Sequence, residues 1–207
     1  MDSIIFDVDG TLWDSTDAVA RSWNLAIEEN SSLPLRIDGA ILRRLFGKTM
    51  TEIADILFPE LPEEERLRLI GICFDYENRY LETHPGTLYD GVIETLQKLS
   101  ARYPLFIVSN CQCGYIEILL KHAELENIVT DHLCFGDTHT PKSETIRTLM
   151  ERNQIQSPVY VGDTQGDADA CRDAGVPFVF AAYGFGQVPD AEVRIERIAD
   201  LEKICLN

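Results

Sequence analysis

Long apolar segments are missing from this 207-residue sequence, and no run approaches the roughly 18 apolar residues that cross a membrane. The opening segment also lacks the basic start and apolar stretch of a secretory signal, because Asp2, Asp7 and Asp9 interrupt it. We therefore expect a cytoplasmic protein that has no membrane partner.

Basic residues are scarce as well: 18 lysines and arginines stand against 35 aspartates and glutamates, which gives a formal net charge of -17. Nucleic acids and anionic membrane surfaces attract clusters of lysine and arginine, so this balance argues against both as partners. The surplus of carboxylates instead fits a protein in which some acidic side chains bind a metal ion.

The six cysteines do not form a framework of paired spacings, and we expect all of them to be reduced. Cys111 and Cys113 form a Cys-x-Cys pair, which is neither the Cys-x-x-Cys redox motif nor half of a common zinc site. Most cysteines are therefore expected to pack as small apolar residues in the core. The four histidines share no ligand spacing either, so we expect them on the surface or in loops.

The sequence does contain short, continuous apolar runs, which are typical of strands buried on both faces of a parallel sheet. Helical patterns with apolar residues on one face lie between the later runs. Strands that alternate with helices predict an α/β fold with a Rossmann-like parallel sheet. The expected strands are 3–6, 105–108, 158–161 and 177–180, with a weaker one at 132–135, and the expected helices are 91–101, 115–122, 142–152 and 167–174.

The segment 14–84 differs, because it contains helical patterns without a strand between them. An all-helical block therefore interrupts the α/β domain after its first strand. The predicted division is an α/β core of residues 1–13 and 85–207, with a helical domain of residues 14–84 inserted into it. The expected helices of the insert are 16–29, 39–45, 49–57 and 62–81.

Polar residues follow the predicted strands at the edge where open parallel sheets bind their ligands. Because the carboxyl ends of parallel strands meet at one edge, we expect these side chains to gather there. The residues concerned are Asp7, Asp9 and Thr11 after the first strand, Ser109 and Asn110 after the second, Lys142 at a helix start, and Asp163 and Asp167 after the strand 158–161.

Several carboxylates need a cation beside them, since two unit charges about 4 Å apart repel by roughly 4 kcal/mol at an effective dielectric constant near 20. Mg²⁺ takes one or two carboxylates together with water and phosphate oxygens. Lys142 and the hydroxyls of Thr11 and Ser109 would suit an anion beside that metal. A metal, an anion clamp and an exposed carboxylate together indicate phosphoryl transfer.

Four segments resemble, in order, the motifs of the haloacid dehalogenase-like (HAD) superfamily. They are Asp7-Val-Asp-Gly-Thr11, Ser109-Asn110, Lys142, and Gly162-Asp163-Thr-Gln-Gly-Asp167. The helical insert resembles the C1-type cap of that superfamily, and the likeness is to its phosphoglycolate phosphatase and β-phosphoglucomutase branch. A lone Asp-x-Asp would be a weak signal, but four ordered motifs that span nearly the whole chain are specific.

The resemblance implies that Asp7 is the nucleophile, which forms an aspartyl-phosphate and binds Mg²⁺. It implies that Asp9 protonates the leaving oxygen, then activates water, and also offers its backbone carbonyl to the metal. In an extended segment alternate residues share a face, and the turn that follows sets the second carboxylate aside. Lys142 is implied to neutralise charge on the nucleophile and on the transferring phosphoryl group.

By the same resemblance, Thr11, Ser109 and Asn110 bind the phosphoryl oxygens. Asp163 is implied to be the second carboxylate on Mg²⁺, while Asp167 is either a direct ligand or a support for the ligands. These roles are expectations from the family, and they depend on the strand ends meeting at one edge of the sheet.

The segment Phe46-Gly-Lys-Thr49 could suggest a nucleotide-binding P-loop, but that motif needs a glycine where Leu42 stands. If the insert is a C1 cap, this loop lies where relatives place substrate-contacting residues. We therefore expect Lys48 to contribute to substrate specificity.

The leading hypothesis is a Mg²⁺-dependent phosphatase that acts on a small phosphorylated metabolite, as phosphoglycolate phosphatases do, and works as a monomer or homodimer. Mutases of the β-phosphoglucomutase type carry a histidine early in the first cap helix and a lysine before the cap-loop glycine. Residues 18–23 contain no histidine and Phe46 precedes Gly47, so hydrolysis is favoured over the mutase alternative. Phosphonate cleavage through Lys48, a signalling receiver and a non-catalytic phospho-ligand-binding module are the remaining, less favoured alternatives.

Overall fold

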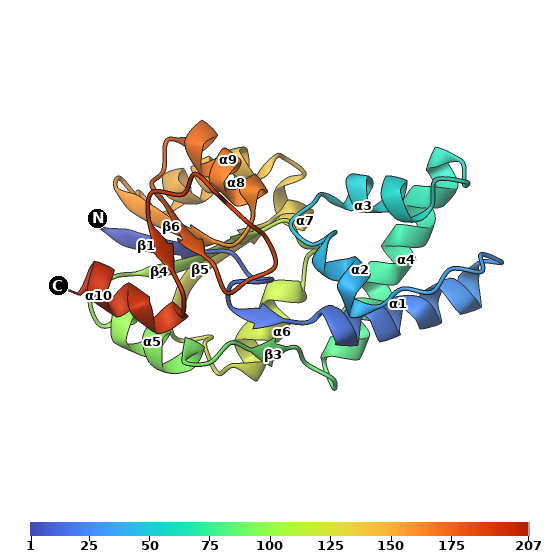
Figure 1. The fold of residues 1–207 in the computed structure, drawn as a ribbon, viewed down its shortest axis with the longest axis horizontal. Helices are drawn as coiled ribbons and strands as arrows, with labels where there is room; N and C mark the ends of the chain where they lie inside the picture. The colour runs from blue at the N-terminus through green and yellow to red at the C-terminus, as the bar shows by residue number, and fades with distance from the viewer. Residues whose placement is uncertain (207) are drawn as a thin grey trace.

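The computed structural model describes residues 1–206, which form a parallel sheet with helices on both faces (Figure 1). All neighbouring strand pairs of this sheet run parallel. The arrangement confirms the α/β, Rossmann-like sheet expected from the sequence. The six strands lie in the order β5 (Val129–Cys134), β4 (Leu105–Ser109), β1 (Ser3–Phe6), β6 (Pro158–Gly162), β7 (Phe178–Ala181) and β8 (Arg194–Ile195).

Alternate residues of β1 enter two separate apolar layers, which explains its continuous apolar run. Ile4 and Phe6 face one layer, and Ile5 faces the other. The helices on the first side are α5 (Val92–Ser100), α6 (Tyr115–His122) and α10 (Leu201–Cys205), and those on the second side are α8 (Lys142–Arg152) and α9 (Gln165–Ala174). Because both faces are covered, the carboxyl-terminal edge of the sheet is the place left for a site.

Four helices from the inserted segment group together beside the sheet (Figure 1). They are α1 (Thr16–Asn30), α2 (Gly39–Arg43), α3 (Met50–Leu57) and α4 (Glu63–Leu81). The helices α1 and α4 pack along each other, and the Trp23 ring meets Phe74 edge-on at a centroid distance of 5.5 Å. Thr49 and Glu52 form a capping box that begins α3. The apolar residues between these helices belong to the same buried cluster as one face of the sheet.

A two-stranded antiparallel ribbon marks the place where the chain leaves the sheet core and returns to it. It consists of β2 (Trp13–Asp14) and β3 (Thr87–Leu88). Trp13 is buried and packs edge-on against Tyr115, with ring centroids 5.5 Å apart. Trp13 therefore packs against α6 at the place where the chain crosses.

The predicted strand 132–135 is wrong in position, because β5 ends at Cys134 and the short helix α7 (Phe135–Thr138) follows. The Asp137 carboxylate accepts a hydrogen bond from the Cys134 backbone N–H at 2.9 Å, which fixes the start of α7. The two-residue strands β2, β3 and β8 have no predicted counterpart, since so short a run carries no periodic signal. The C-terminal elements η1 (Ile198–Asp200) and α10 were not predicted either, and the other elements agree with prediction to within two residues.

All six cysteines are free, as expected. Four of them are buried, whereas Cys111 is partly buried and Cys113 is exposed. Within residues 1–206, no helix combines the length and apolar character needed to cross a membrane.

Candidate active site

The candidate site lies at the carboxyl ends of the central strands, where the chain connections diverge from β1. Asp7 follows β1 directly, Asp163 follows β6, and Asp167 comes from the first turn of α9. One carboxylate oxygen from each of the three lies within 4.8 Å of the others, and all three side chains are buried. The structure therefore brings these aspartates together at one edge of the sheet.

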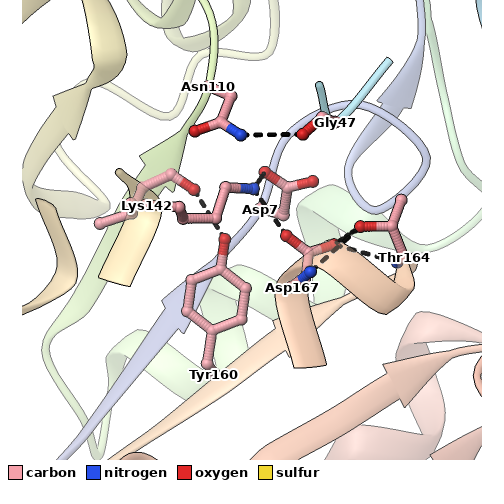
Figure 2. Close-up of polar contacts among 8 residues, drawn as sticks. Asp7, Gly47, Asn110, Lys142, Tyr160, Thr164 and Asp167 are labelled. Atoms are coloured by element: carbon pink, nitrogen blue, oxygen red, sulfur yellow. Dashed lines mark hydrogen bonds and ion pairs between the residues drawn. The ribbon is translucent and has the colours of Figure 1, made fainter. Parts of the chain in front are cut away.

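Lys142, the first residue of α8, neutralises part of this charge (Figure 2). Its Nζ donates to Asp7 Oδ1 at 2.9 Å and to Asp167 Oδ1 at 2.6 Å, inside the protein. Burial alone would lower the pKa of Lys142, but the charges of Asp167 and Asp7 raise it, so the amine stays protonated. Burial and the charge of Asp167 outweigh Lys142 at Asp7 and raise the pKa of that carboxyl to about 6.

Asp163 presents one carboxylate oxygen that no protein group satisfies. Its Oδ2 accepts a hydrogen bond from the Phe185 backbone N–H at 2.7 Å, whereas its Oδ1 is buried and has no partner among residues 1–206. Burial, together with the charges of Asp167 and Asp7, raises the pKa of Asp163 well above its usual range. An unsatisfied buried polar group costs about 1–3 kcal/mol, and a cation bound at Oδ1 would remove this cost.

Mg²⁺ fits this donor set, because it prefers oxygen ligands and commonly combines one or two carboxylates with water. Asp7 and Asp163 are the carboxylates that would hold it. Both oxygens of Asp167 are engaged, Oδ1 by Lys142 and Oδ2 by the backbone N–H and hydroxyl of Thr164 at 2.9 Å and 2.6 Å. This arrangement favours a supporting position for Asp167.

Two glycines allow the backbone to approach Asp163 closely. Gly10 has a φ of +80°, and a Cβ there would lie 2.1 Å from Asp163 Oδ2. A Cβ at Gly184, in the loop after β7, would lie 2.3 Å from the Gly10 carbonyl oxygen. Side chains at these positions would displace Asp163, so the glycines are needed for its present placement.

Asp9 has different partners from Asp7, although only one residue separates them. Its Oδ1 accepts hydrogen bonds from the Tyr115 hydroxyl at 2.6 Å and the Ser15 hydroxyl at 3.1 Å. The pKa of Asp9 is raised to about 7, mainly because its carboxylate is removed from solvent. The hydrogen bond from Tyr115 lowers this pKa, and the charge of Asp7 raises it further. Asp9 can therefore give or take a proton near neutral pH.

A cavity of about 30 Å³ lies between the helical block and the strand ends. Asp7, Asp9, Ser109 and Asn110 line its core side. This volume corresponds to about one water molecule, so the present arrangement has no room for a phosphorylated metabolite. Thr11 is not among the lining residues; its side chain is fully buried, and its hydroxyl has no hydrogen-bond partner within the described part of the chain.

The loop between α2 and α3 closes the opposite side of the cavity. Phe46, Gly47 and Lys48 line it there. The Asn110 side chain donates a hydrogen bond from Nδ2 to the Gly47 carbonyl at 2.8 Å (Figure 2). The Asn110 amide thus joins the core to this loop through one of its two N–H donors.

Glu77 of α4 also lines the cavity, and the sequence analysis did not identify it. Trp23 Nε1 donates to one of its carboxylate oxygens at 2.6 Å and Gln112 Nε2 to the other at 3.0 Å. Burial raises the pKa of Glu77 to about 8 against these hydrogen bonds, and the Asp9 charge adds to the effect. An acidic residue four positions from both Cys73 and Leu81, on the apolar face of α4, was the available signal.

Replacing Glu77 by glutamine should remove part of the pH dependence of folding stability. Folding raises the pKa of Glu77 from 4.5 to about 8, so between these values the folded protein holds a proton that the unfolded chain releases. This contribution is complete below pH 4.5 and is lost as the pH rises toward 8. Each unit by which the pKa differs between the folded and unfolded protein corresponds to about 1.4 kcal/mol. The free energy of unfolding of the wild type should therefore fall by several kcal/mol relative to that of Glu77→Gln across this range.

Urea unfolding at about pH 5 and about pH 8 measures this difference. Glu126→Gln, at an exposed glutamate outside the network, is the matched control and should follow the wild type. An identical pH slope for Glu77→Gln and wild type would show that Glu77 ionises normally in the folded protein.

The parallel sheet and the strand-end carboxylates define an α/β protein with an acidic site at the carboxyl ends of its strands, and comparison with known proteins specifies the family. Residues 4–181 match the family model described as haloacid dehalogenase-like hydrolase. The chain is similar to a solved haloacid dehalogenase-like family hydrolase from Streptococcus pneumoniae, with a TM-score of 0.84 and 19% identity over 99% of this chain and 98% of that one.

Two curated relatives are phosphoglycolate phosphatases. The enzyme from Rhodobacter capsulatus is 28% identical over 90% of this chain and 87% of its own, and that from Agrobacterium fabrum is 29% identical over 95% of this chain and 87% of its own. The chain therefore belongs to the haloacid dehalogenase-like hydrolase family, in its phosphoglycolate phosphatase-like branch, and is a hydrolase of the phosphatase type.

Proposed function

We propose that this protein hydrolyses a small phosphorylated metabolite of the phosphoglycolate class, with Mg²⁺ at the strand-end carboxylates and Asp7 as the nucleophile. The observation that carries the proposal is the pair of carboxylates in one cavity with different partners: Asp7 is bonded to Lys142, and Asp9 to Tyr115. The curated relatives, which are named phosphoglycolate phosphatases, support the substrate class.

In the first step, an Asp7 oxygen attacks the phosphorus atom and the bond from phosphorus to the substrate oxygen breaks. Protonated Asp9 gives its proton to that oxygen, which leaves as a hydroxyl group of the product. Lys142 keeps its positive charge beside Asp7 and stabilises the transferring phosphoryl group. Bound by Asp7, Asp163 and the Asp9 carbonyl, Mg²⁺ would supply further positive charge at that group.

In the second step, the Asp9 carboxylate takes a proton from water, whose oxygen attacks the phosphorus of the aspartyl-phosphate. The bond from phosphorus to Asp7 breaks, which regenerates the Asp7 carboxylate and releases phosphate. Ser109 and Asn110 border the same cavity, and we assign them, with Thr11, to the phosphoryl oxygens. Thr11 needs a local rearrangement to reach that position, because its side chain is buried. Asn110 keeps a second amide N–H besides the one that is bonded to Gly47.

We also propose that residues 14–84 act as a cap on a catalytic core made of residues 1–13 and 85–207. The β2–β3 ribbon lies where the chain crosses between the two parts. The cavity has room for about one water molecule, so a phosphorylated substrate needs the cap to move away from the strand ends. Closure would then exclude bulk water from the reaction and restrict the enzyme to small substrates.

The direct test is phosphate release from p-nitrophenyl phosphate by enzyme treated with EDTA, with and without added Mg²⁺. A panel of phosphorylated metabolites that includes phosphoglycolate then defines the substrate. No phosphate release with any of them, and no binding of beryllofluoride, would refute the proposed function.

Lys48→Ala should lower kcat/KM for the best anionic substrate by roughly tenfold to hundredfold, the value of one hydrogen bond to a charged group. Lys48 lines the cavity from the cap loop, where its amine can meet the part of the substrate that leaves. The matched control is Lys121→Ala, an exposed lysine on α6. Unchanged kcat/KM for every substrate in the panel would show that Lys48 does not determine specificity.

The cavity does not support the mutase alternative. Within residues 1–206, no histidine lines it. The acidic composition supports an enzyme that acts without nucleic acid or an anionic membrane surface. We further propose that it is cytoplasmic and works as a monomer or homodimer. Light scattering on the purified protein measures its oligomeric state.

A further inference from the structure

A second group of potential metal ligands lies at the end of β5, outside the acidic cluster of Asp7, Asp163 and Asp167. Cys113, Cys134 and Asp137 each place one ligand atom within 4.8 Å of the others. The Cys113 thiol donates to Asp137 Oδ1 at 3.3 Å, and the Cys134 thiol donates to Asp137 Oδ2 at 3.1 Å. Two thiols thus converge on one carboxylate, although the two cysteines lie 21 positions apart along the chain.

The spacing of these atoms is close to that of a tetrahedral metal site. With metal–sulfur and metal–oxygen distances of about 2.3 Å and 2.0–2.2 Å, tetrahedral geometry places sulfur and oxygen about 3.5 Å apart. The observed sulfur–oxygen distances are 3.3 Å and 3.1 Å, and each sulfur meets a different oxygen of Asp137. One thiol therefore has to shift toward the oxygen that binds the metal, and one ligand atom of each residue already lies within 4.8 Å of the others. Cys113 is exposed, which provides an entry path, while Cys134 is buried.

We propose that Cys113, Cys134 and Asp137 form a binding site for a thiophilic divalent cation of the Zn²⁺ class. Thiolate sulfur selects such cations, whereas the oxygen-only cluster of Asp7 and Asp163 suits Mg²⁺. Binding replaces two thiol protons with one divalent ion, so two protons are released and the net charge of the site stays at minus one. The proposal is independent of the proposed phosphatase function.

One of the proposed ligands, Cys113, lies on a loop that contacts both the candidate active site, through Gln112, and α4. This loop follows Ser109 of β4, and its Cys113 carbonyl accepts a hydrogen bond from Asn78 of α4 at 2.8 Å. The Gly136 N–H donates to the Cys111 carbonyl at 3.0 Å, which ties the loop to α7. A metal ion at Cys113 would hold this loop in place and stabilise the cap-contacting arrangement.

The test is a Co²⁺ titration of the full chain, first stripped with EDTA, kept reduced, and supplied with saturating Mg²⁺ to occupy the acidic cluster. We expect one equivalent of Co²⁺ to produce a thiolate-to-cobalt charge-transfer absorption, with release of two protons. Zn²⁺ should displace the Co²⁺ and abolish the absorption. Saturating Zn²⁺ should also raise the Tm by roughly 5 °C.

Cys113→Ser should lose the charge-transfer absorption and bind Co²⁺ at least about tenfold more weakly. Because Cys113 is exposed, this variant is expected to fold, and Asp137→Asn provides a second test of the same ligand set. Cys205→Ser, at a buried cysteine outside the cluster, should bind as the wild type does. No charge-transfer absorption in the wild type, or a full signal in both Cys113→Ser and Asp137→Asn, would overturn the proposal.

Discussion

Replacing Asp7 by asparagine is expected to lower kcat by at least about 10⁴-fold, as expected for the loss of a covalent nucleophile. The amide cannot attack phosphorus to form the acyl-phosphate, and it also removes a carboxylate from the metal position. The fold should survive, because Lys142 keeps its ion pair with Asp167 at 2.6 Å and the substitution is nearly isosteric. The Tm of the variant should therefore stay close to that of the wild type, although its kcat falls.

Steady-state kinetics with p-nitrophenyl phosphate, alongside circular dichroism, measures this prediction. Asp173→Asn is the matched control, since Asp173 is exposed and forms only a surface ion pair with Arg172 at 3.4 Å. Surface pairs contribute about 0–1 kcal/mol, so this variant should keep wild-type activity. An Asp7→Asn enzyme within tenfold of the wild type would exclude Asp7 as the nucleophile.

Replacing Asp9 by asparagine should lower kcat by about 10²- to 10⁴-fold, the usual contribution of a general acid–base. The amide keeps an oxygen that can accept the hydrogen bond from Tyr115, now 2.6 Å from Asp9, so the geometry should be preserved. What is lost is a group whose pKa of about 7 allows it to donate and accept a proton. The defect should therefore be chemical rather than structural.

The nature of the leaving group separates the two roles of Asp9. A p-nitrophenolate leaves without protonation, so Asp9→Asn should form the aspartyl-phosphate from p-nitrophenyl phosphate and hydrolyse it slowly, which makes the intermediate accumulate. An alkyl phosphate needs the proton, so both steps should be slow. Equal defects for the two substrates, with no accumulated intermediate, would contradict an acid–base role for Asp9.

The core of the candidate site was predictable because sheet topology alone determines it. Asp7 and Asp163 follow neighbouring parallel strands, whose carboxyl ends must meet, and Lys142 begins a helix beside them. Apolar runs locate such strands, and the polar residues after them can then be assigned to one edge. The same reasoning places Ser109, the last residue of β4, at that edge.

The residues that join the cap to the core were not predictable in this way. The contacts of Glu77 with Gln112, and of Asn110 with Gly47, depend on how the inserted helices pack against the strand ends. Sequence periodicity describes each element by itself and contains no information on that packing. Thr11 shows the converse limit, since its motif suggests an exposed hydroxyl and the side chain is fully buried here.

The group formed by Cys113, Cys134 and Asp137 was not predictable from the sequence for a related reason. Spacing along the chain indicates metal sites only when the ligands are close in sequence, and Cys111 with Cys113 matches no common zinc pattern. Cys113, Cys134 and Asp137 come together because β4 pairs in parallel with β5 and because the Asp137 carboxylate accepts a hydrogen bond from the Cys134 backbone N–H at the start of α7. A three-dimensional neighbourhood was needed to find it.

The central claim, that Asp7 becomes phosphorylated, is tested most directly by mass spectrometry of enzyme quenched in acid during turnover with Mg²⁺. The Asp9→Asn variant with p-nitrophenyl phosphate should give the highest yield. The account predicts a hydroxylamine-labile phosphoryl group on Asp7, absent when EDTA is added and absent in Asp7→Asn. Phosphate release without any phosphorylated residue, or with the phosphoryl group on a residue other than Asp7, would contradict it.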